Sequence, residues 1–237
     1  MNEYIKEKVK AHALRVAPEE CCGFICVNPL GDITVFECEN KEFNKNNRFQ
    51  IDPKMNVEAE RFGTIVAFYH SHASDENLNL SPHDLDASFE SCIPALLYVV
   101  PQDIWKFNVP TTYEPAPLIG RPFVFGIWDC FTIVRDYCLM HKNILLGSYF
   151  EPTKEELKTS DCFDRCSVNE KFEVIPLEQI REGDVMLFRT KEFTGFHLGI
   201  YLGNNEFMHQ PLKSISCVNQ LERSHLKKLD KVLRIIP

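Results

Sequence analysis

The chain has 237 residues, which suffices for one large domain or two small ones, and its formal net charge of −8 disfavours a nucleic-acid partner, whose phosphates require Lys and Arg. Hydrophobic residues make up 44% and charged residues 25%, ordinary values for a globular protein, and no apolar run is long enough to span a membrane. The first ten residues are charged and amphipathic, so we expect no secretory signal there.

The first half of the chain alternates helical and strand-like patterns. Apolar residues at helical spacing predict a helix over residues 3–17, a short helix is expected near 54–62, and a third begins at Ser81. Apolar runs bounded by turn residues predict strands over residues 21–27, 33–38, 64–72, 95–100 and 104–109. Helices mixed with strands predict an α/β domain.

Residues 110–122 are rich in proline, which restricts its own backbone dihedral and that of the residue before it. We therefore expect an extended linker over residues 111–121. The linker predicts one domain over residues 1–110 and a second over residues 122–237.

The second half begins with a predicted helix over residues 129–141, followed by a polar, turn-rich region over 147–180. Short apolar runs then predict strands over residues 184–189, 197–203, 206–211, 214–219 and 231–236. One leading helix and a late sheet predict an α+β domain.

Two histidines and one aspartate in the first half have the spacing of metal ligands. His70 and His72 lie two residues apart on a predicted strand, so their side chains share one face. Asp84 adds an oxygen ligand, and three protein ligands with an open fourth position are typical of a catalytic zinc site. Each part also has an ordinary explanation, because paired strand histidines are often only packed or solvated, and Ser81 with Asp84 also fits a capping box.

Glu20 precedes the first predicted strand and is the candidate proton carrier, accepting a proton from the attacking water and passing it to the leaving amine. Glu19 is the competing carboxylate. The family resemblance described next implies Glu20, which lies three residues before Gly23 as the corresponding glutamate of that family does.

In this order, the glutamate, His-Ser-His and Ser-x-x-Asp resemble the JAMM metallopeptidase family over residues 1–110. The resemblance implies a JAMM/MPN-like fold and Zn²⁺ held by the two histidines and the aspartate. It also implies Glu20 as the base and Ser81 as the group that steadies the tetrahedral intermediate. The loop between His72 and Ser81 is one residue longer than is usual in the family, and Ala73 stands where proline commonly follows. We expect these differences to alter the substrate surface more than the metal.

A candidate cysteine nucleophile begins the predicted helix of the second half. Asp129 is a natural N-cap, which places Cys130 in the first turn, where free N–H groups and the helix dipole favour a thiolate. His197 is the candidate base, and His209 on the following strand would hold its imidazole in the right tautomer. The alternative is a buried structural cysteine with two sheet histidines.

With Glu182-Gly183-Asp184-Val185 before a strand, these parts resemble the NlpC-type cysteine peptidases over residues 121–237. The resemblance implies a papain-like fold, with Cys130 as nucleophile, His197 as base and His209 as orienting group. It further implies an oxyanion hole that includes the Cys130 amide. NlpC-type enzymes typically cleave peptidoglycan stem peptides between D-Glu and a diamino acid.

The remaining cysteines have less distinctive surroundings. Phe131 and Thr132 replace the small residues that often follow the nucleophile, so the pocket floor is expected to be bulkier. Cys138 and Cys217 are expected in the core. Cys162 and Cys166 could suggest a further zinc site, but they lack a second pair of ligands.

A JAMM-like domain followed by an NlpC-type domain resembles a family of phage tail assembly proteins. The resemblance implies a bifunctional peptidase that cleaves amide or isopeptide bonds in peptidoglycan stem peptides or in a tail protein. It implies other tail-tip proteins as partners, and a location in the host cytoplasm during assembly or at the virion tail tip. Two alternatives stay open: a structural tail-tip component with weak or no activity, and a cellular isopeptidase, which only the JAMM-like half suggests.

Overall fold

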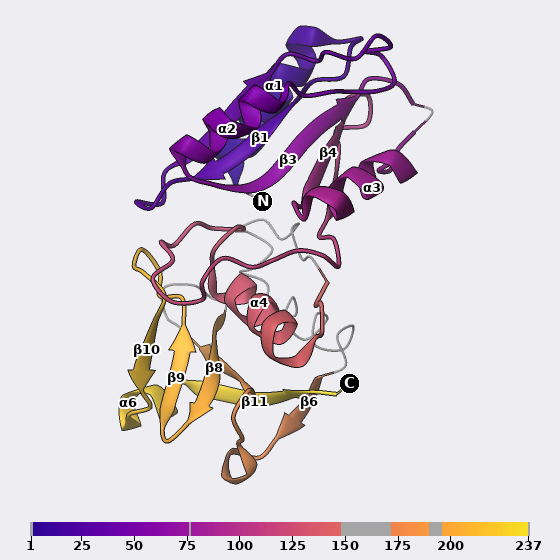
Figure 1. The fold of residues 1–237 in the computed structure, drawn as a ribbon. Coiled ribbons are helices and arrows are strands. Elements are labelled where there is room, and N and C mark those ends of the chain that lie inside the picture. The colour runs from indigo at the N-terminus through magenta and orange to yellow at the C-terminus, as the bar shows by residue number, and fades with distance from the viewer. Residues whose placement is uncertain (1, 76, 148–171, 190–195, 237) are drawn as a thin grey trace. The chain divides into compact units, whose positions relative to one another are not determined.

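The computed structural model describes residues 2–75, 77–147, 172–189 and 196–236, and the chain divides into two compact units, Asn2–Glu114 and Pro115–Pro237 (Figure 1). Among the described residues, no helix combines the length and apolar character that crossing a bilayer requires. The candidate cysteine pair at positions 162 and 166 lies outside the described residues.

The first unit is built on a five-stranded mixed sheet in the order β2-β1-β3-β4-β5. Its strands are β1 (Cys22–Val27), β2 (Ile33–Cys38), β3 (Thr64–His72), β4 (Ala95–Val99) and β5 (Ile104–Asn108). β3 and β4 are parallel, and the other neighbours are antiparallel. All five predicted strands are confirmed, with ends that differ by at most one residue.

Three helices cover this sheet: α1 (Glu3–Val16), α2 (Pro53–Phe62) and α3 (Pro82–Ser91), each within a residue or two of its predicted span. Adjacent residues of β3 show which face each helix covers. The Tyr69 hydroxyl forms a hydrogen bond with the His12 ring of α1, whereas Phe68 packs in the apolar cluster to which α2 contributes. Because successive strand residues point to opposite faces, α1 and α2 lie on opposite sides of the sheet.

The second unit packs helix α4 (Cys130–Lys142) against a six-stranded antiparallel sheet in the order β10-β9-β8-β7-β11-β6. The strands are β6 (Phe172–Ile175), β7 (Val185–Arg189), β8 (Phe196–Gly203), β9 (Glu206–His209), β10 (Cys217–Gln220) and β11 (Leu229–Ile235). Apolar residues of α4, β7, β8 and β11 form its core. The predicted helix and all five predicted strands are confirmed.

Three details of the second unit differ from the sequence prediction. Residues 172–175 were predicted as part of a turn-rich region and instead form β6 beside β11. Two short helical segments, η2 (Leu177–Gln179) and α6 (Arg223–Leu226), were not predicted. β6 is an edge strand of four residues whose two central side chains are exposed, so it lacks the apolar run by which the other strands were found.

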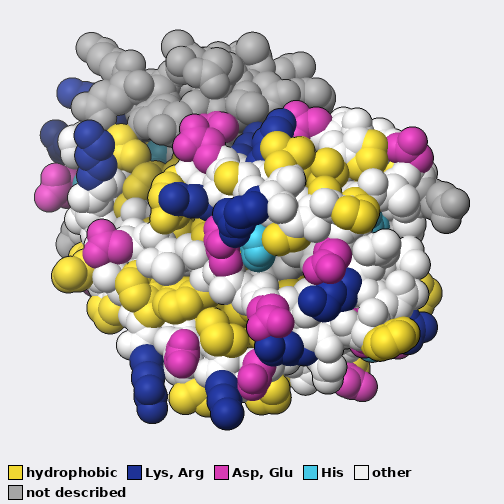
Figure 2. All heavy atoms as spheres, turned by 90° about the horizontal axis from the view of Figure 1, so that it is seen from above, with side chains coloured by type: hydrophobic (Ala, Val, Ile, Leu, Met, Phe, Trp, Pro, Cys, Tyr) yellow, Lys and Arg dark blue, Asp and Glu magenta, His cyan; other side chains and the backbone are white. Residues whose placement is uncertain are grey.

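On the one face that Figure 2 draws, charges of both signs are interspersed. Figure 2 shows one face, on which Lys and Arg side chains lie next to Asp and Glu, with apolar side chains between them. The net charge of −8 is therefore not concentrated in a single acidic patch on that face. The described side chains of that face form no continuous basic surface of the kind that binds nucleic-acid backbones.

Two candidate active sites

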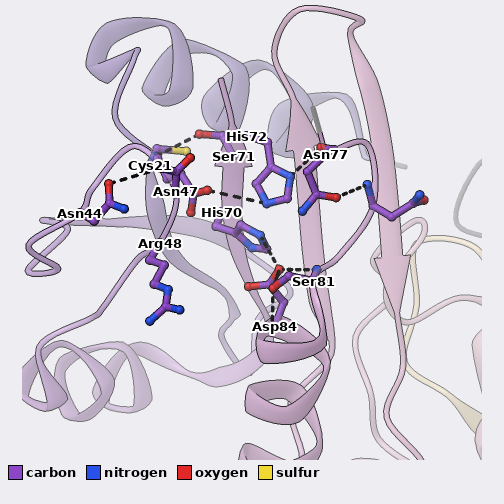
Figure 3. A network of polar contacts seen from close by, with 12 residues as sticks. Cys21, Asn44, Asn47, Arg48, His70, Ser71, His72, Asn77, Ser81 and Asp84 are labelled. Carbon is purple, nitrogen blue, oxygen red and sulfur yellow. Dashed lines mark hydrogen bonds and ion pairs between the residues drawn. The ribbon is translucent and has the colours of Figure 1, made fainter. Parts of the chain in front are cut away.

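His70 and His72 end strand β3 and lie on its α2 face, and Asp84 lies in the first turn of α3 (Figure 3). All three are buried, and their candidate ligand atoms lie within 4.8 Å of one another. His70 Nε2 is 3.4 Å from Asp84 Oδ2. Among the described residues, this is the one group of three or more His, Cys, Asp or Glu side chains that meets as a ligand set does.

Both histidines have ring nitrogens that no described residue occupies and that are available to bind a metal ion. Both nitrogens of His70 are buried and without a hydrogen bond to any described residue, while Phe49 stacks on the ring at 4.7 Å and 22°. A buried polar group without a partner costs about 1–3 kcal/mol. His72 Nδ1 lies 2.9 Å from the Asn77 carbonyl oxygen, which can only accept, so Nδ1 carries the proton and Nε2 has its lone pair free. Two imidazoles and one carboxylate in this state fit Zn²⁺.

The electrostatics also favour the ligand forms of these side chains. Burial lowers the pKa of His72, which keeps the imidazole neutral. Burial opposes ionisation of Asp84, but the His70 ring 3.4 Å away and the hydrogen bonds of Ser81 outweigh it and hold the pKa of this carboxyl below its usual range. A neutral imidazole and an ionised carboxylate are the forms that bind a metal ion.

Ser81 is the N-cap of α3 and is bound closely to Asp84. Its backbone N–H and its hydroxyl both donate to Asp84 Oδ2 at 2.7 Å, and Ser81 Oγ accepts from the Asp84 backbone N–H at 3.2 Å. A serine hydroxyl has a single proton to donate. In this structure that proton is directed at the candidate ligand Asp84, and a reaction intermediate would have to compete for it.

Of the two candidate glutamates, only Glu20 lies at the histidines. Glu20 is buried, and its Oε1 is 3.8 Å from His72 Nε2. Burial raises the pKa of Glu20 to about 8, and the negative charge of Asp84 adds to the effect. Glu19 is only partly buried and pairs with Lys45 at 3.6 Å.

A buried asparagine that the sequence analysis did not identify fixes the loop beside Glu20. Asn40 donates through Nδ2 to the Glu20 carbonyl at 3.1 Å and to the Arg48 carbonyl at 2.9 Å. Asn40 Oδ1 accepts from the backbone N–H groups of Glu42 and Gln50 at 3.0 and 3.1 Å. The side chain thus fixes both sides of the loop that carries Phe49 over His70. Nothing in a single sequence marks this asparagine out from its neighbours.

In the second unit, Asp129 caps α4 as predicted. Its Oδ1 accepts from the N–H groups of Phe131 and Thr132 at 3.0 Å each, and the Asp129 N–H donates to Thr132 Oγ1 at 2.8 Å. Cys130 is therefore the first residue of the helix. The location predicted for this cysteine is confirmed.

The predicted acidity of Cys130 is wrong for the protein as it stands. Burial, aided by the negative charge of the Asp129 carboxylate, raises the pKa of this thiol to about 12. The backbone N–H groups at the helix start and that of Leu198 act in the opposite direction but are outweighed. The contact with Leu198 places the thiol beside β8, directly after His197.

His197 and His209 meet across β8 and β9. His197 Nε2 lies 2.7 Å from His209 Nδ1, with the rings 73° apart. Gly199 stands opposite His209 in the sheet, and a Cβ there would lie 3.0 Å from the Phe207 ring and 3.1 Å from the Met208 carbonyl. Burial lowers the pKa of each histidine to about 4, aided at His197 by His209 and at His209 by His225. Both imidazoles are therefore neutral at neutral pH.

Two residues of β10 that the sequence analysis did not place in the site complete this group. Asn219 Nδ2 lies 3.1 Å from His209 Nε2, and Cys217 Sγ lies 3.7 Å from the same nitrogen. The prediction that Cys217 belongs to the core is wrong, because this residue begins an edge strand directly opposite His209 and is partly exposed. Cys138 is buried in the core, as predicted. The pairing of β9 with β10 would have revealed these neighbours.

Comparison with known families defines the class of each half. Residues 3–110 match the family of prokaryotic homologues of the JAB domain, and residues 120–234 match the NlpC/P60 family. The chain is thus a protein with an N-terminal Prok-JAB domain followed by an NlpC/P60 domain. This confirms the predicted fold class, an α/β JAMM/MPN-like domain and an α+β papain-like domain of NlpC type.

Two relatives share most of the chain. It is 29% identical over 220 residues to the tail tip assembly protein K of Escherichia phage N15, covering 88% of this chain and 85% of the relative. It is 29% identical over 167 residues to the protein of that name from Escherichia phage lambda, covering 70% and 79%. The predicted resemblance to phage tail assembly proteins is confirmed.

More local likenesses accompany these two. The chain is 41% identical over 49 residues to the murein DD-endopeptidase MepS/murein LD-carboxypeptidase of Escherichia coli K12, covering 21% of this chain and 26% of the relative. A crystal structure of the NlpC/P60 domain of peptidoglycan hydrolase SagA aligns with a TM-score of 0.34 at 19% identity, covering 50% of this chain and 90% of that one. The two families together support a peptidase-type function.

Proposed function

We propose that this chain is a bifunctional peptidase of a phage tail tip, which cleaves amide or isopeptide bonds in peptidoglycan stem peptides or in a tail protein. Residues 1–110 would form one catalytic domain and residues 122–237 the other, joined by the linker 111–121. The two matched families and the names of the tail-tip relatives support this proposal. Other tail-tip proteins would be its partners, in the host cytoplasm during assembly and at the virion tail tip.

In the first domain, His70, His72 and Asp84 would hold Zn²⁺. The observation that carries this proposal is the buried His70 ring, whose two nitrogens lack a hydrogen-bond partner in the described chain. A zinc ion bound there supplies Lewis-acid chemistry that polarises the scissile carbonyl. Glu20 Oε1, 3.8 Å from His72 Nε2, would take the proton of the attacking water and deliver it to the leaving amine. Ser81 would hold Asp84 in place and is the candidate for steadying the intermediate.

In the second domain, Cys130 Sγ would attack the carbonyl carbon while its proton passes to His197 Nδ1. The imidazolium then protonates the amine as the C–N bond breaks, and water hydrolyses the thioester to release the acid. With the thiol at a pKa of about 12 and the imidazole at about 4, the thiol would stay protonated until the substrate arrives. The proton transfer and the attack would therefore occur together, with His209 holding the base.

The test uses the purified full chain and defined stem peptides that contain the bond between D-Glu and a diamino acid. We expect Cys130→Ser to abolish their cleavage and a chelator to leave it unchanged. Cys92→Ser, at a partly exposed cysteine of the first unit, is the matched control and should cleave normally. Cleavage that survives in Cys130→Ser would overturn the assignment of the nucleophile. A complete lack of cleavage would favour the structural tail-tip component.

A further inference from the structure

A chain of hydrogen bonds crosses three neighbouring strands of the second unit, β8, β9 and β10 (Figure 1). It runs from His197 Nε2 to His209 Nδ1 at 2.7 Å, and from His209 Nε2 to Asn219 Nδ2 at 3.1 Å. Cys217 Sγ closes the group, 3.7 Å from His209 Nε2 and 3.7 Å from Asn219 Oδ1. Every member therefore contacts at least one other through a polar atom.

Such a chain has a direction, because a neutral imidazole carries one proton on one of its two nitrogens. If His197 Nε2 donates to His209 Nδ1, the Nδ1 lone pair of His197 is free to take a proton from Cys130. His209 must then carry its own proton on Nε2 and donate it onward. In the opposite direction, His209 Nδ1 donates, His197 Nδ1 carries the proton, and His197 cannot act as a base.

The side chain of Asn219 must donate to His209 Nε2 in one direction of the hydrogen-bond chain and accept from it in the other. Its amide has a nitrogen that only donates and an oxygen that only accepts, on two arms of similar size. With the nitrogen facing His209 Nε2, as the structure has it, His209 Nε2 must accept and the chain runs in the unproductive direction. The Cys217 thiol favours this orientation, since it can donate to the amide oxygen. A half-turn of the amide presents the oxygen to His209 Nε2 and reverses the chain.

We propose that Asn219 is a positioning residue that sets the tautomer of the His197–His209 pair, and that rotation of its amide switches the base between an unproductive and a productive form. This inference rests on the proposed cysteine-peptidase function. Asn219 touches neither substrate nor nucleophile in this scheme and acts only through His209. Cys217 would stabilise the unproductive form.

The test measures the tautomer of each histidine directly, by ¹⁵N NMR of the labelled full chain at pH 8.5, where both rings are neutral. Asn219→Asp offers only acceptors, so we expect His209 and His197 to carry their protons on Nε2. Asn219→Leu has a similar size and no polar atom, so the preference should disappear. Gln220→Leu is the matched control, on the same strand with its side chain bound to Glu206. It should leave both tautomers as they are in the parent protein.

Turnover of the stem peptide gives the second measurement. We expect kcat of Asn219→Asp to exceed that of the parent at unchanged KM, because an acceptor at His209 Nε2 holds the pair in the productive direction, and kcat of Asn219→Leu to stay below that of Asn219→Asp. An Asn219→Asp protein that keeps the His209 proton on Nδ1 would overturn the proposal, as would a kcat of Asn219→Asp no higher than that of Asn219→Leu. If the tautomers shift as expected but no variant cleaves, the positioning role stands and the proposed peptidase function fails.

Discussion

Replacing Ser81 with alanine tests whether this serine acts on the metal site through Asp84. Its hydroxyl donates to Asp84 Oδ2 at 2.7 Å and also accepts from the Asp84 N–H as the cap of α3. Ser81→Ala therefore removes a helix cap and one of the donors that fix the carboxylate. Asp52→Ala is the matched control, since Asp52 caps α2 through the Lys54 N–H at 2.9 Å and contacts none of the candidate ligands through that bond.

Ser81→Ala should lower the free energy of unfolding by more than Asp52→Ala does. Loss of a cap alone costs about 1 kcal/mol, which is the whole expectation for Asp52→Ala. Ser81→Ala also leaves a buried carboxylate short of a hydrogen bond, which adds about 1–3 kcal/mol. Groups that orient a metal ligand are worth about 10–100-fold in affinity, or about 1.4–2.7 kcal/mol, so zinc binding should weaken by that factor in Ser81→Ala only.

Urea unfolding of the metal-free proteins gives their free energies of unfolding, and competition with a chromophoric chelator gives their zinc affinities. The expected pattern is two destabilised proteins, of which one also binds zinc more weakly. Unchanged zinc affinity in Ser81→Ala together with lost turnover would refute the reasoning. The hydroxyl would then leave Asp84 during the reaction and serve the intermediate, as the family resemblance implies.

Three further predictions concern other groups. Glu20→Gln should keep zinc by metal analysis while the chelator-sensitive activity falls about 10²–10⁴-fold, and loss of zinc instead would make Glu20 a ligand. Burial lowers the pKa of His197 and His209 from 6.5 to about 4, so the folded protein binds fewer protons than the unfolded chain between these values. The free energy of unfolding that these neutral histidines contribute should be complete above pH 6.5 and should decline as the pH falls towards 4. The decline should be about 3 kcal/mol, with the hydrogen-bonded pair counted once. Urea unfolding at pH 6.5 and at pH 4 would give equal free energies if the reasoning is wrong. Asp136→Asn, which breaks a buried ion pair with Arg121, should cost about 3–5 kcal/mol in chemical unfolding. Asp230→Asn, at a pair whose Arg189 partner is exposed, should cost at most about 1 kcal/mol.

The elements that carry the sites were predictable because local patterns determine them. The alternation along β3 placed His70 and His72 on one face, and the side chains of Ser81 and Asp129 located the starts of α3 and α4. In each case the signal lies within a few residues of the feature, where strand periodicity and capping chemistry act.

The second layer of each site was not predictable from the sequence. Asn40 binds groups up to 20 residues away, and Asn219 reaches His209 only because β9 and β10 pair in one register. The raised pKa of Cys130 has the same origin, since the local helix start predicts an acidic thiol but the folded chain buries it. Contacts between distant segments decide these features, and no local pattern encodes them.

The alternation of β3 also links catalysis to folding. The residues of this strand that face α1 hold the scaffold: Tyr69 bonds to His12, and the Ser71 hydroxyl accepts from the Cys21 N–H at 2.9 Å. The alternate residues of β3, on the opposite face, include the candidate ligands His70 and His72. A shift of β3 by one position would turn both histidines towards α1 and place Tyr69 and Ser71 where zinc would bind. Zinc would bind only the chain with β3 in its native register, so the ion would stabilise the native strand pairing over a shifted one. An insertion within β3 should therefore be far less tolerated than one in the loop that follows it.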